Sequence, residues 1–412
     1  MLEERPQVVI AGGGIAGLEA LLALGDLAGD RIALTLAAPE PAFTYKPLIV
    51  EEPFSSQPAE QHELAPIVEE RGGRFLRQGI TSVDTGWRKV RLTDGTEIGY
   101  DAAVICVGAR ARPAFPSAIT FQSAGESLRL ADLLSEAKGG RPERIAFLVP
   151  PTNTWPLPIY ELALMTQRRG RELGLGDVEY VVYTPEQAPL IAFGTIASEA
   201  VSEVMRARGI AVHTGARVHE DEGGHLVITP GGQRVEASHV VALPELEGPA
   251  IPGLPSDRGG FLPIDEHGRV SGTEDIYAAG DGTNFPIKQG GLGTQQADAA
   301  AAHIAARFGA EIEPQPFHPV LRGMLITGGE SLSLEHPLTG GEGEGTASTD
   351  YLWWPPHKVS GRYLAPFLAG VSVHADPTPP GRTIEVEVAL PKEWHREPMA
   401  LDPLGAPIDT AE

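Results

Sequence analysis

The chain has 412 residues, of which 42% are apolar, and this is enough for two or three domains with hydrophobic cores. Its 32 basic and 55 acidic residues give a net charge of −23, which argues against nucleic acid and anionic lipid as partners. The single cysteine, Cys106, excludes an intramolecular disulfide, a multi-cysteine metal site and a redox dithiol within one chain.

The first predicted element is a strand-turn-helix unit at residues 7–22, QVVIAGGGIAGLEALL. Its glycines match the pattern G-x-G-x-x-G between a strand and a helix, and this context predicts that a dinucleotide places its pyrophosphate on the helix N-terminus. The candidate cofactor-binding residues here are Gly12, Gly14, Ile15, Ala16 and Gly17.

The same motif bears on the cellular location, because it begins too early to leave room for a secretory signal. No apolar run in the sequence is long enough to span a bilayer. We therefore expect a cytoplasmic protein, and we leave open a peripheral contact with the inner face of the membrane.

The second predicted strand, RIALTLAAPE, should end in an acid about 20 residues beyond the glycines, where it would hold a ribose hydroxyl. The expected place holds Ala37 and Ala38, and Glu40 follows beyond Pro39. Two interpretations stay open: Glu40 reaches the ribose from the loop, or it is a solvated turn residue.

Farther along, VRLTDGTEIGYDAAVICVGAR predicts a hairpin that turns at Asp94 and Gly95, followed by a buried strand over 102–107 that ends at Gly108. Cys106 lies inside that strand. We interpret it as a small buried apolar residue, because a reactive thiol needs an electropositive and accessible setting.

The middle of the chain, residues 112–240, is typical of a second domain of alternating strands and helices, with strands at RIAFLV, VEYVVY and GIAVHTG. Its first loop, VPPTNTWPLP, lacks the three glycines, and its prolines lack the amide donors that a pyrophosphate needs. A helix N-terminus near Ile159 remains. Binding of NAD(P)H is therefore expected to be weakened but not abolished.

A further strand over 275–279 is predicted to end at Gly280 and Asp281, and a glycine-rich loop then leads into a helix over about 294–307. The last hundred residues are rich in Pro, Gly and aromatic residues and are predicted to form a cap or interface region. The twelve histidines include no H-E-x-x-H motif, so no metal site is expected.

The ordered trio VVIAGGGIAGLEA, AAVICVGA and TEDIYAAGD resembles the FAD-dependent flavoproteins of the pyridine nucleotide-disulfide oxidoreductase type. That resemblance implies an FAD domain split by an inserted second domain, with Asp281 on the ribityl chain of FAD. It also implies that the KQGGLGTQQAD helix points its positive end at the flavin N1 and C2 oxygen. Lys288 either adds to this charge or is a solvated loop lysine. The candidates added here are Gly108, Gly280, Asp281, Lys288 and Gly291.

Within that superfamily, the sequence is most similar to sulfide:quinone oxidoreductases, flavocytochrome c sulfide dehydrogenases and type II NADH dehydrogenases. FTYKPLIVEEPF resembles their segment after the second strand, which adds Lys46 and Pro47 to the cofactor-binding candidates. WPLPIYELA resembles the sulfide-oxidising branch, but Trp155 stands where that branch carries a catalytic cysteine. The resemblance therefore implies that sulfide oxidation through a cysteine disulfide is unavailable to this chain.

The predicted fold is α/β, with two Rossmann-like domains, the second inserted in the first, and a C-terminal cap. The predicted boundaries are 1–111 and 241–315 for the FAD-binding domain, 112–240 for the inserted NAD(P)-binding-like domain, and 316–412 for the cap.

The predicted function is an FAD-dependent oxidoreductase that moves electrons from a small donor to a quinone-like or other acceptor, with Trp155, Tyr160 and Lys288 on the flavin face. One alternative is an NAD(P)H:acceptor oxidoreductase like the type II NADH dehydrogenases. Another is a non-catalytic flavin-binding scaffold or redox-responsive protein. The aromatic segment 351–370 is interpreted as packing on the FAD domain or on a homodimer partner, with a quinone mouth or membrane-facing plate as the alternative.

Overall fold

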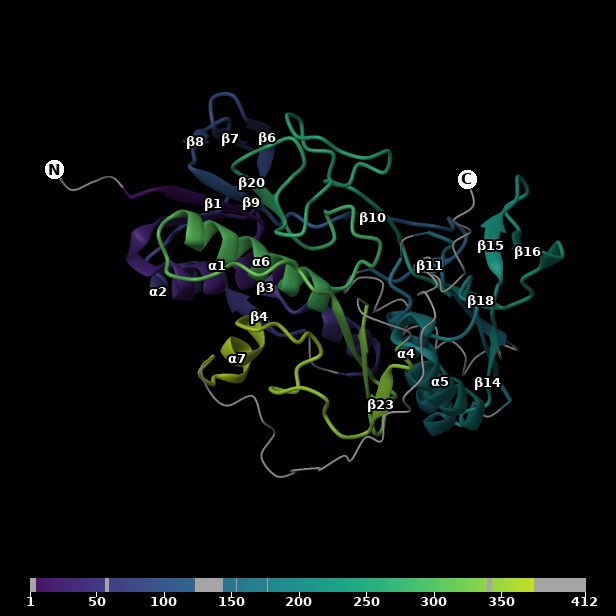
Figure 1. The fold of residues 1–412 in the computed structure, drawn as a ribbon. Coiled ribbons are helices and arrows are strands. Elements are labelled where there is room, and N and C mark those ends of the chain that lie inside the picture. The colour runs from purple at the N-terminus through teal and green to yellow at the C-terminus, as the bar shows by residue number, and fades with distance from the viewer. Residues whose placement is uncertain are drawn as a thin grey trace, which may run out of the picture.

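The computed structural model describes residues 5–55, 59–122, 144–152, 154–175, 177–338 and 343–373. Two α/β units lie side by side (Figure 1), one built from the purple, blue and green parts of the chain and the other from its teal middle. A smaller antiparallel region in yellow-green follows them in the sequence.

The first unit is built on a sheet of five parallel strands in the order β20-β9-β1-β2-β5. Residues on alternate positions of β1 face opposite layers: Val8 and Ile10 pack towards the helices, and Val9 and Ala11 pack towards a small antiparallel sheet. Because both faces are covered, these strands are continuous apolar runs. They are β1 (Gln7–Ala11), β2 (Ala33–Ala37), β5 (Arg74–Leu76), β9 (Ala102–Ile105) and β20 (Ile276–Ala278).

Two long helices, α1 (Ile15–Leu27) and α6 (Gly290–Arg307), lie against each other over this sheet (Figure 1). Both helices are rich in alanine and leucine at the shared face, which lets them approach closely. The opposite face of the sheet is covered by the antiparallel strands β6 (Ile80–Asp84), β7 (Lys89–Leu92) and β8 (Glu97–Gly99). The predicted turn between β7 and β8 is confirmed, with Gly95 at a φ of +86°.

The second unit has the same design, with five parallel strands in the order β11-β18-β12-β13-β14. Its helices are α4 (Leu157–Glu172) and α5 (Thr195–Ala207), which pack with the sheet into one core. The strands are β11 (Ile119–Thr120), β12 (Arg144–Leu148), β13 (Glu179–Tyr183), β14 (Ile210–His213) and β18 (His239–Ala242).

The second unit is inserted into the first, as predicted. β20 pairs with β9 in the first sheet, although all strands of the second sheet lie between them in the chain. Where the chain crosses between the units, β10 (Arg110–Arg112) pairs antiparallel with β19 (Glu245–Glu247). The exact boundary residues of the domains stay predictions.

The short elements complete the two units. In the first unit they are η1 (Gly29–Arg31), β3 (Ala42–Thr44), η2 (Lys46–Phe54), β4 (Gln61–Glu63) and α2 (Leu64–Glu70). In the second they are η3 (Ile191–Phe193), β15 (Arg217–Glu220), β16 (Leu226–Thr229) and β17 (Gln233–Arg234).

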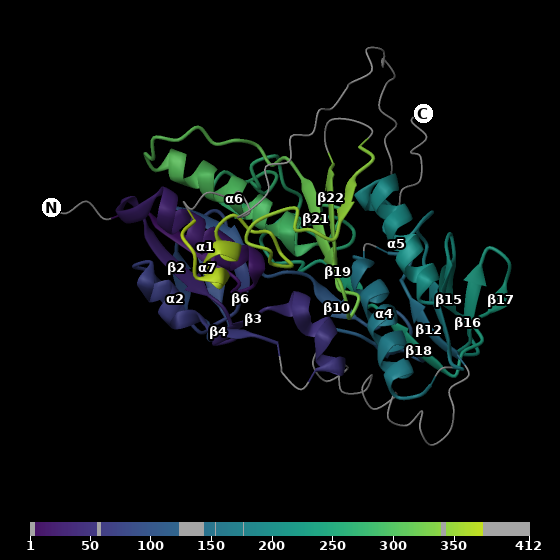
Figure 2. The same cartoon turned by 90° about the horizontal axis from the view of Figure 1, so that it is seen from below.

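The C-terminal region forms a three-stranded antiparallel sheet and a short helix rather than a third α/β unit. Its elements are β21 (Val320–Leu325), β22 (Leu332–Pro337), β23 (Thr346–Ser348) and α7 (Leu364–Ala369). β21 contacts α6 of the first unit and α4 of the second, and Figure 2 shows it standing between them. α7 packs on α1. This region therefore bridges both units.

Several predicted boundaries differ from the structure. β9 ends at Ile105 rather than at residue 107, so Cys106 lies just beyond the strand, and β20 spans Ile276–Ala278 rather than 275–279. Helix α6 begins at Gly290 rather than near residue 294, because the Gln289 side chain accepts a hydrogen bond from the Leu292 N–H and caps the helix. The glycines at its start make this turn resemble a loop in the sequence. Within the described ranges, no helix combines the length and the apolar character needed to cross a bilayer.

Candidate functional site

The glycine turn after β1 is built for close backbone contact. Gly12 has a φ of +112°, and a Cβ there would lie 2.2 Å from the Cys106 carbonyl oxygen. A Cβ on Gly17 would lie 1.9 Å from the Gly12 carbonyl oxygen. A Cβ on Gly14 would meet nothing within 4 Å. The outer two glycines thus let strand and helix pack, and the middle one leaves open space in front of the helix N-terminus.

A groove of about 540 Å³ runs across the carboxyl ends of the first sheet, at this open space. This is where ligands bind in open α/β sheets, and the volume falls within the usual range for ligand pockets. Nine predicted cofactor-binding residues line it: Gly12, Gly14, Ile15, Ala16, Glu40, Lys46, Gly108, Gly280 and Asp281. Gly17 and Gly291 line neither this groove nor the pocket that follows it.

The residues that follow β2 lie at the groove. Ala37 and Ala38, in the expected place of an acid, are buried groove-lining residues, and Glu40 lies exposed at the rim beyond Pro39. Its carboxylate can therefore face a groove occupant or the solvent, and both interpretations of Glu40 stand.

A second pocket of about 320 Å³ lies where the two units and the C-terminal region meet. Its apolar walls come from η2, the start of α4, the end of the second sheet and β21. The apolar lining residues include Pro47, Ile49, Val50, Phe121, Trp155, Leu157, Leu243, Leu246, Met324 and Val359. Its charged lining residues are Lys46, Asp281, Lys288 and Lys358.

The groove and the pocket are continuous. Lys46, Ala109, Asp281 and Gly290 line both of them. Gly290 is the first residue of α6, so the positive end of that helix lies at the junction. An extended ligand can therefore lie in the groove and place one end in the apolar pocket, beside a helix N-terminus and an acid.

Lys288 is a buried residue of this pocket, and the interpretation of a solvated loop lysine is wrong. Its ammonium group donates a hydrogen bond to the Thr283 carbonyl oxygen and lies 3.7 Å from the centre of the Phe261 ring. Burial lowers the pKa of Lys288 to about 8, and the negative charges of Asp281 and Asp257 partly oppose this shift. Burial also raises the pKa of Asp281, with Lys288 and Lys46 opposing.

Of the two aromatic candidates, only Trp155 reaches the pocket. Trp155 lines it and packs edge-on against Phe193, with 5.5 Å between ring centres. Tyr160 is fully buried, and its hydroxyl donates a 2.7 Å hydrogen bond to Glu186 on the far side of α4. The pocket-facing residues at the start of α4 are instead Leu157 and Pro158.

A buried ion pair that sequence reasoning missed lies beside the pocket. Glu161 of α4 is fully buried, and its Oε2 lies 2.6 Å from the ammonium of Lys358. Its Oε1 accepts a 2.8 Å hydrogen bond from the Ile326 N–H. Burial raises the pKa of Glu161 to about 7, although Lys358 opposes the shift. The motif WPLPIYELA contains this glutamate directly after Tyr160. No local sequence pattern indicates that it pairs with Lys358, which lies 197 positions away.

The inserted unit differs from the first at its own ribose position. Glu186 follows β13 as Glu40 follows β2, but Glu186 is buried and accepts hydrogen bonds from the hydroxyls of Tyr160 and Thr184. Burial raises the pKa of Glu186 to about 7. The turn before the helix is also longer, residues 149–156 against 12–14, and it ends with Pro156.

The single thiol takes no part in either cavity's chemistry. Cys106 is buried just beyond the end of β9, beneath the glycine turn, and burial raises the pKa of its thiol to about 12. As predicted from the sequence, it is a small core residue rather than a nucleophile. No cluster of three metal-ligating side chains occurs in the part of the chain that the structure describes.

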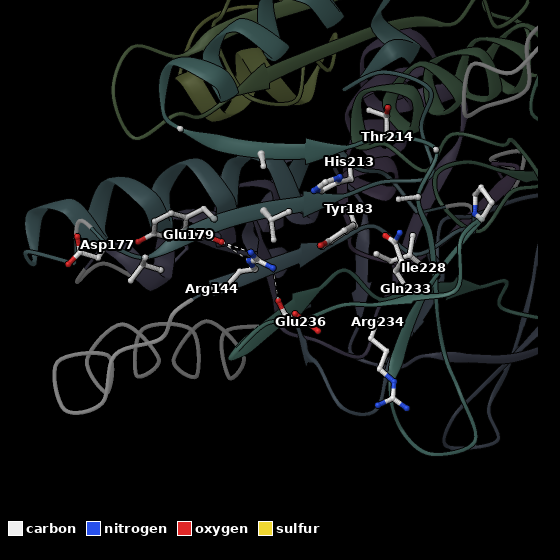
Figure 3. Close-up of a pocket in the computed structure, with 18 residues that line it drawn as sticks. Arg144, Asp177, Glu179, Tyr183, His213, Thr214, Ile228, Gln233, Arg234 and Glu236 are labelled. Atoms are coloured by element: carbon white, nitrogen blue, oxygen red, sulfur yellow. Dashed lines mark hydrogen bonds and ion pairs between the residues drawn. The ribbon is translucent and has the colours of Figure 1, made fainter.

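A larger cavity of about 1110 Å³ lies on the inserted unit, away from the groove (Figure 3). It is formed by the face of the second sheet that the helices leave uncovered, together with β16 and β17. Arg144 points at Glu179 and is paired with it at 2.6 Å, and the ring of Tyr183 stacks on His213. Because Arg144 is already paired with Glu179 and the Tyr183 ring is already stacked on His213, we assign no ligand to it.

Comparison with known proteins agrees with this geometry. The family model described as "Pyridine nucleotide-disulphide oxidoreductase" matches residues 6–147 and 161–304. Rhodocoxin reductase from Rhodococcus erythropolis is 25% identical over 68% of this chain, which spans 65% of that protein's length. An NADH dehydrogenase-like protein from Mycobacterium tuberculosis is 25% identical over 67% of this chain and 72% of its own length.

Among solved structures, the sulfide:quinone oxidoreductase from Aquifex aeolicus superposes with a TM-score of 0.74. The match covers 83% of this chain and 86% of that one, at 19% sequence identity. At this level of identity the likeness shows the fold alone.

Proposed function

Because the chain belongs to the pyridine nucleotide-disulphide oxidoreductase family, we propose that it is an FAD-dependent oxidoreductase that transfers electrons from a small donor to a quinone-like acceptor. The observation that carries the proposal is the continuous cavity in which a dinucleotide groove opens into an apolar pocket at Asp281 and Gly290. A dinucleotide with a large planar end fits that shape.

The residues present fit FAD. The open space in front of Gly14 and the N-terminus of α1 suit a pyrophosphate, and Asp281 lines both the groove and the pocket. The N-terminus of α6 and Lys288 supply positive charge at the pocket end. When bound, FAD supplies the electron transfer, and the protein contributes position, charge and the exclusion of water.

The reaction does not use a thiol relay. The chain contains one cysteine, which is buried and has a raised pKa, so no disulfide can accept a sulfur atom or an electron pair in the pocket. Trp155 occupies pocket space with an apolar ring. This supports direct transfer between the bound molecules rather than a covalent intermediate on the protein.

The pocket suits a quinone-like acceptor because it combines apolar walls with a source of protons. Reduction of a quinone consumes protons as well as electrons, and a group with a pKa near the working pH can supply them. Glu161, with a pKa of about 7, lies directly behind Lys358, whose side chain lines the pocket. We propose that Glu161 takes up and releases the proton, and that Lys358, which pairs with Glu161 at 2.6 Å and lines the pocket, passes that proton to the acceptor.

NAD(P)H:acceptor oxidoreductase activity is the second candidate, and the names of the relatives favour it. The hydrogen bonds that occupy Glu186 argue against it, because in this fold a free acid at that position holds a ribose hydroxyl. We therefore assign the donor to another class of small molecule.

The first experiment tests whether the reduced flavin passes its electrons to a quinone. Protein reconstituted with FAD is reduced anaerobically with one equivalent of dithionite and mixed with a short-chain ubiquinone, while the visible flavin band is followed. Recovery of the band much faster than with free reduced FAD supports the proposal. Recovery at the rate of free FAD contradicts it and favours the non-catalytic scaffold.

The same preparation, in its oxidised form, is mixed anaerobically with NADH and then with NADPH. Bleaching within seconds would establish the second candidate in place of the first. Persistence of the band with both nucleotides supports a different donor.

A further inference from the structure

A segment near the C-terminus is fastened to both α/β units. We call residues 357–364 the strap. The Lys358 ammonium pairs with Glu161 of the inserted unit at 2.6 Å, and the Val359 N–H donates a 2.7 Å hydrogen bond to the Tyr45 hydroxyl of the first unit. At its far end, the N–H groups of Tyr363 and Leu364 donate to the two oxygens of Glu19 at 2.7 and 2.8 Å.

The strap forms one wall of the apolar pocket. Lys358 and Val359 line the pocket, and a Cβ placed on Gly290 would lie 3.1 Å from Val359 Cγ2. The strap is therefore packed against the N-terminus of α6. Any movement of the strap moves the ammonium group of Lys358 with respect to the pocket.

Glu19 is the anchor of the strap on the first unit. It lies on α1, its side chain is fully buried, and its carboxylate accepts two backbone N–H groups. Gly361 makes this approach possible, because a Cβ there would lie 2.4 Å from Glu19 Oε2. Charge-assisted hydrogen bonds of this kind need the carboxylate in its ionised form.

A second carboxyl group, half-buried, lies beside this anchor. It belongs to Asp298 of α6, next to Glu19 where α1 and α6 contact each other. Asp298 Oδ1 is buried and has no hydrogen-bond partner in the described part of the chain. Burial, and next the negative charge of Glu19, raise the pKa of Asp298 well above its ordinary value, while Arg362 of the strap opposes the shift. The neutral Asp298 can then donate its proton to the ionised Glu19.

We propose that Glu19 and Asp298 form a one-proton acid pair that fastens the strap to α1 and thereby positions Lys358 at the pocket, and that loss of the shared proton loosens the strap. Both are positioning residues, since neither lines the pocket. The proposal concerns the docking of the strap and holds whether or not the pocket takes a quinone-like acceptor.

The sign of the pH dependence follows from the burial of the pair. With the strap docked, Asp298 keeps its proton to a higher pH than it would in water. Docking therefore weakens as pH rises above the ordinary carboxyl pKa, by up to about tenfold per pH unit for one proton, and levels off once the docked pair is ionised. Arg362, the Tyr363 side chain and Asp26 are the other charged or titratable groups around the pair.

Hydrogen–deuterium exchange of the full-length protein tests the proposal. Protection factors of the Tyr363 and Leu364 amides are measured from pH 6 to pH 9, with β1 amides as the reference for global unfolding. In the wild type, protection at the strap should fall as pH rises. In Asp298→Asn it should stay nearly constant, because the amide donates to ionised Glu19 at every pH.

Comparison with this variant also cancels the titration of Glu161 and His357, which the two proteins share. Equal pH dependence in wild type and Asp298→Asn would overturn the proposal. If Asp298→Asn does not fold, as judged by circular dichroism, Arg362→Gln takes its place.

Arg362 is exposed and opposes the raised pKa of Asp298. Its removal should leave the fold intact, raise the pH at which the loss of protection levels off, and so increase the total loss between pH 6 and pH 9. An unchanged profile would contradict the shared proton. Glu19→Gln, which cannot accept both N–H groups, should lower strap protection by about tenfold or more at every pH.

Discussion

The hydroxyl of Tyr160 and the carboxylate of Glu186 are joined by a 2.7 Å hydrogen bond in the interior of the inserted unit. Tyr160 enters from α4 and Glu186 from the loop after β13, so the bond ties the helix to the sheet end. In the first unit, the corresponding acid Glu40 is exposed at the rim of the groove. The two α/β units thus share a design and differ in whether the acid after the corresponding strand is buried or exposed.

The Tyr160→Phe variant tests how strongly this bond holds the unit. It should lower the free energy of unfolding by about 1–3 kcal/mol, because a buried carboxyl group loses a donor. Since the donor favours the ionised form of Glu186, the loss should be larger at pH 8 than at pH 5. Urea denaturation at both pH values measures it.

Tyr180→Phe is the matched control, since the Tyr180 hydroxyl is buried without a partner among the described residues. Its removal should leave stability unchanged or increase it. A loss with Tyr180→Phe as large as with Tyr160→Phe would show that the hydroxyl of Tyr160 has no special role.

Asp281→Asn should weaken the retention of FAD by about tenfold or more, because Asp281 lines both the groove and the pocket. The measurement is the dissociation constant of FAD from flavin fluorescence, in buffer of fixed ionic strength. Glu274→Gln, an exposed acid on the same stretch of chain, is the control and should bind FAD as the wild type does. Wild-type affinity in Asp281→Asn would remove Asp281 from the cofactor site.

Substitution of Gly17 should affect mainly folding, and substitution of Gly14 should affect mainly FAD binding. In Gly17→Ala, the added Cβ would lie 1.9 Å from a backbone oxygen, so the variant should lose about 1–3 kcal/mol of stability or more. In Gly14→Ala, the Cβ enters open space, so the protein should fold normally and bind FAD about tenfold less tightly. Thermal melting with and without FAD distinguishes them, and equal melting temperatures of the two apoproteins would contradict the assignment.

In the buried Glu161–Lys358 pair, removing one charge should destabilise the protein more than removing both. Lys358→Met leaves Glu161 buried without its cation and should cost about 3–5 kcal/mol at pH 8. The pKa of Glu161 should then rise above its value of about 7, so the cost should shrink as pH falls towards 5. Adding Glu161→Gln to Lys358→Met should restore most of the stability. A double variant as unstable as the single one would show that charge is not the cause.

The sequence predicts this fold and the groove well because their signals are local. Glycine at positions 12 and 17 is required by contacts within a few residues or with one neighbouring strand, and Asp281 follows closely after β20. The pairing of Glu161 with Lys358 has no such signal, since 197 positions separate them and the contact depends on how the C-terminal region packs.

The orientation of Tyr160 also could not be predicted from a local sequence pattern. The motif that contains it is apparent in the sequence, but the side of α4 that faces the pocket is decided by the packing of the helix on β13 and β21. That packing turns Leu157 and Pro158 towards the pocket and Tyr160 away from it.

Because Cys106 is buried, the rate at which its thiol reacts can report local opening of the protein. As the single cysteine of the chain, it lies directly under the glycine turn, where the Gly12 backbone touches its carbonyl group. Cys106 lines the groove but is only 6% exposed, so a thiol-reactive dye should label it quickly only when the surrounding backbone opens. The rate of labelling therefore measures how often the floor of the groove opens, and its slowing by added FAD would measure how firmly a ligand holds that floor closed, without any engineered label.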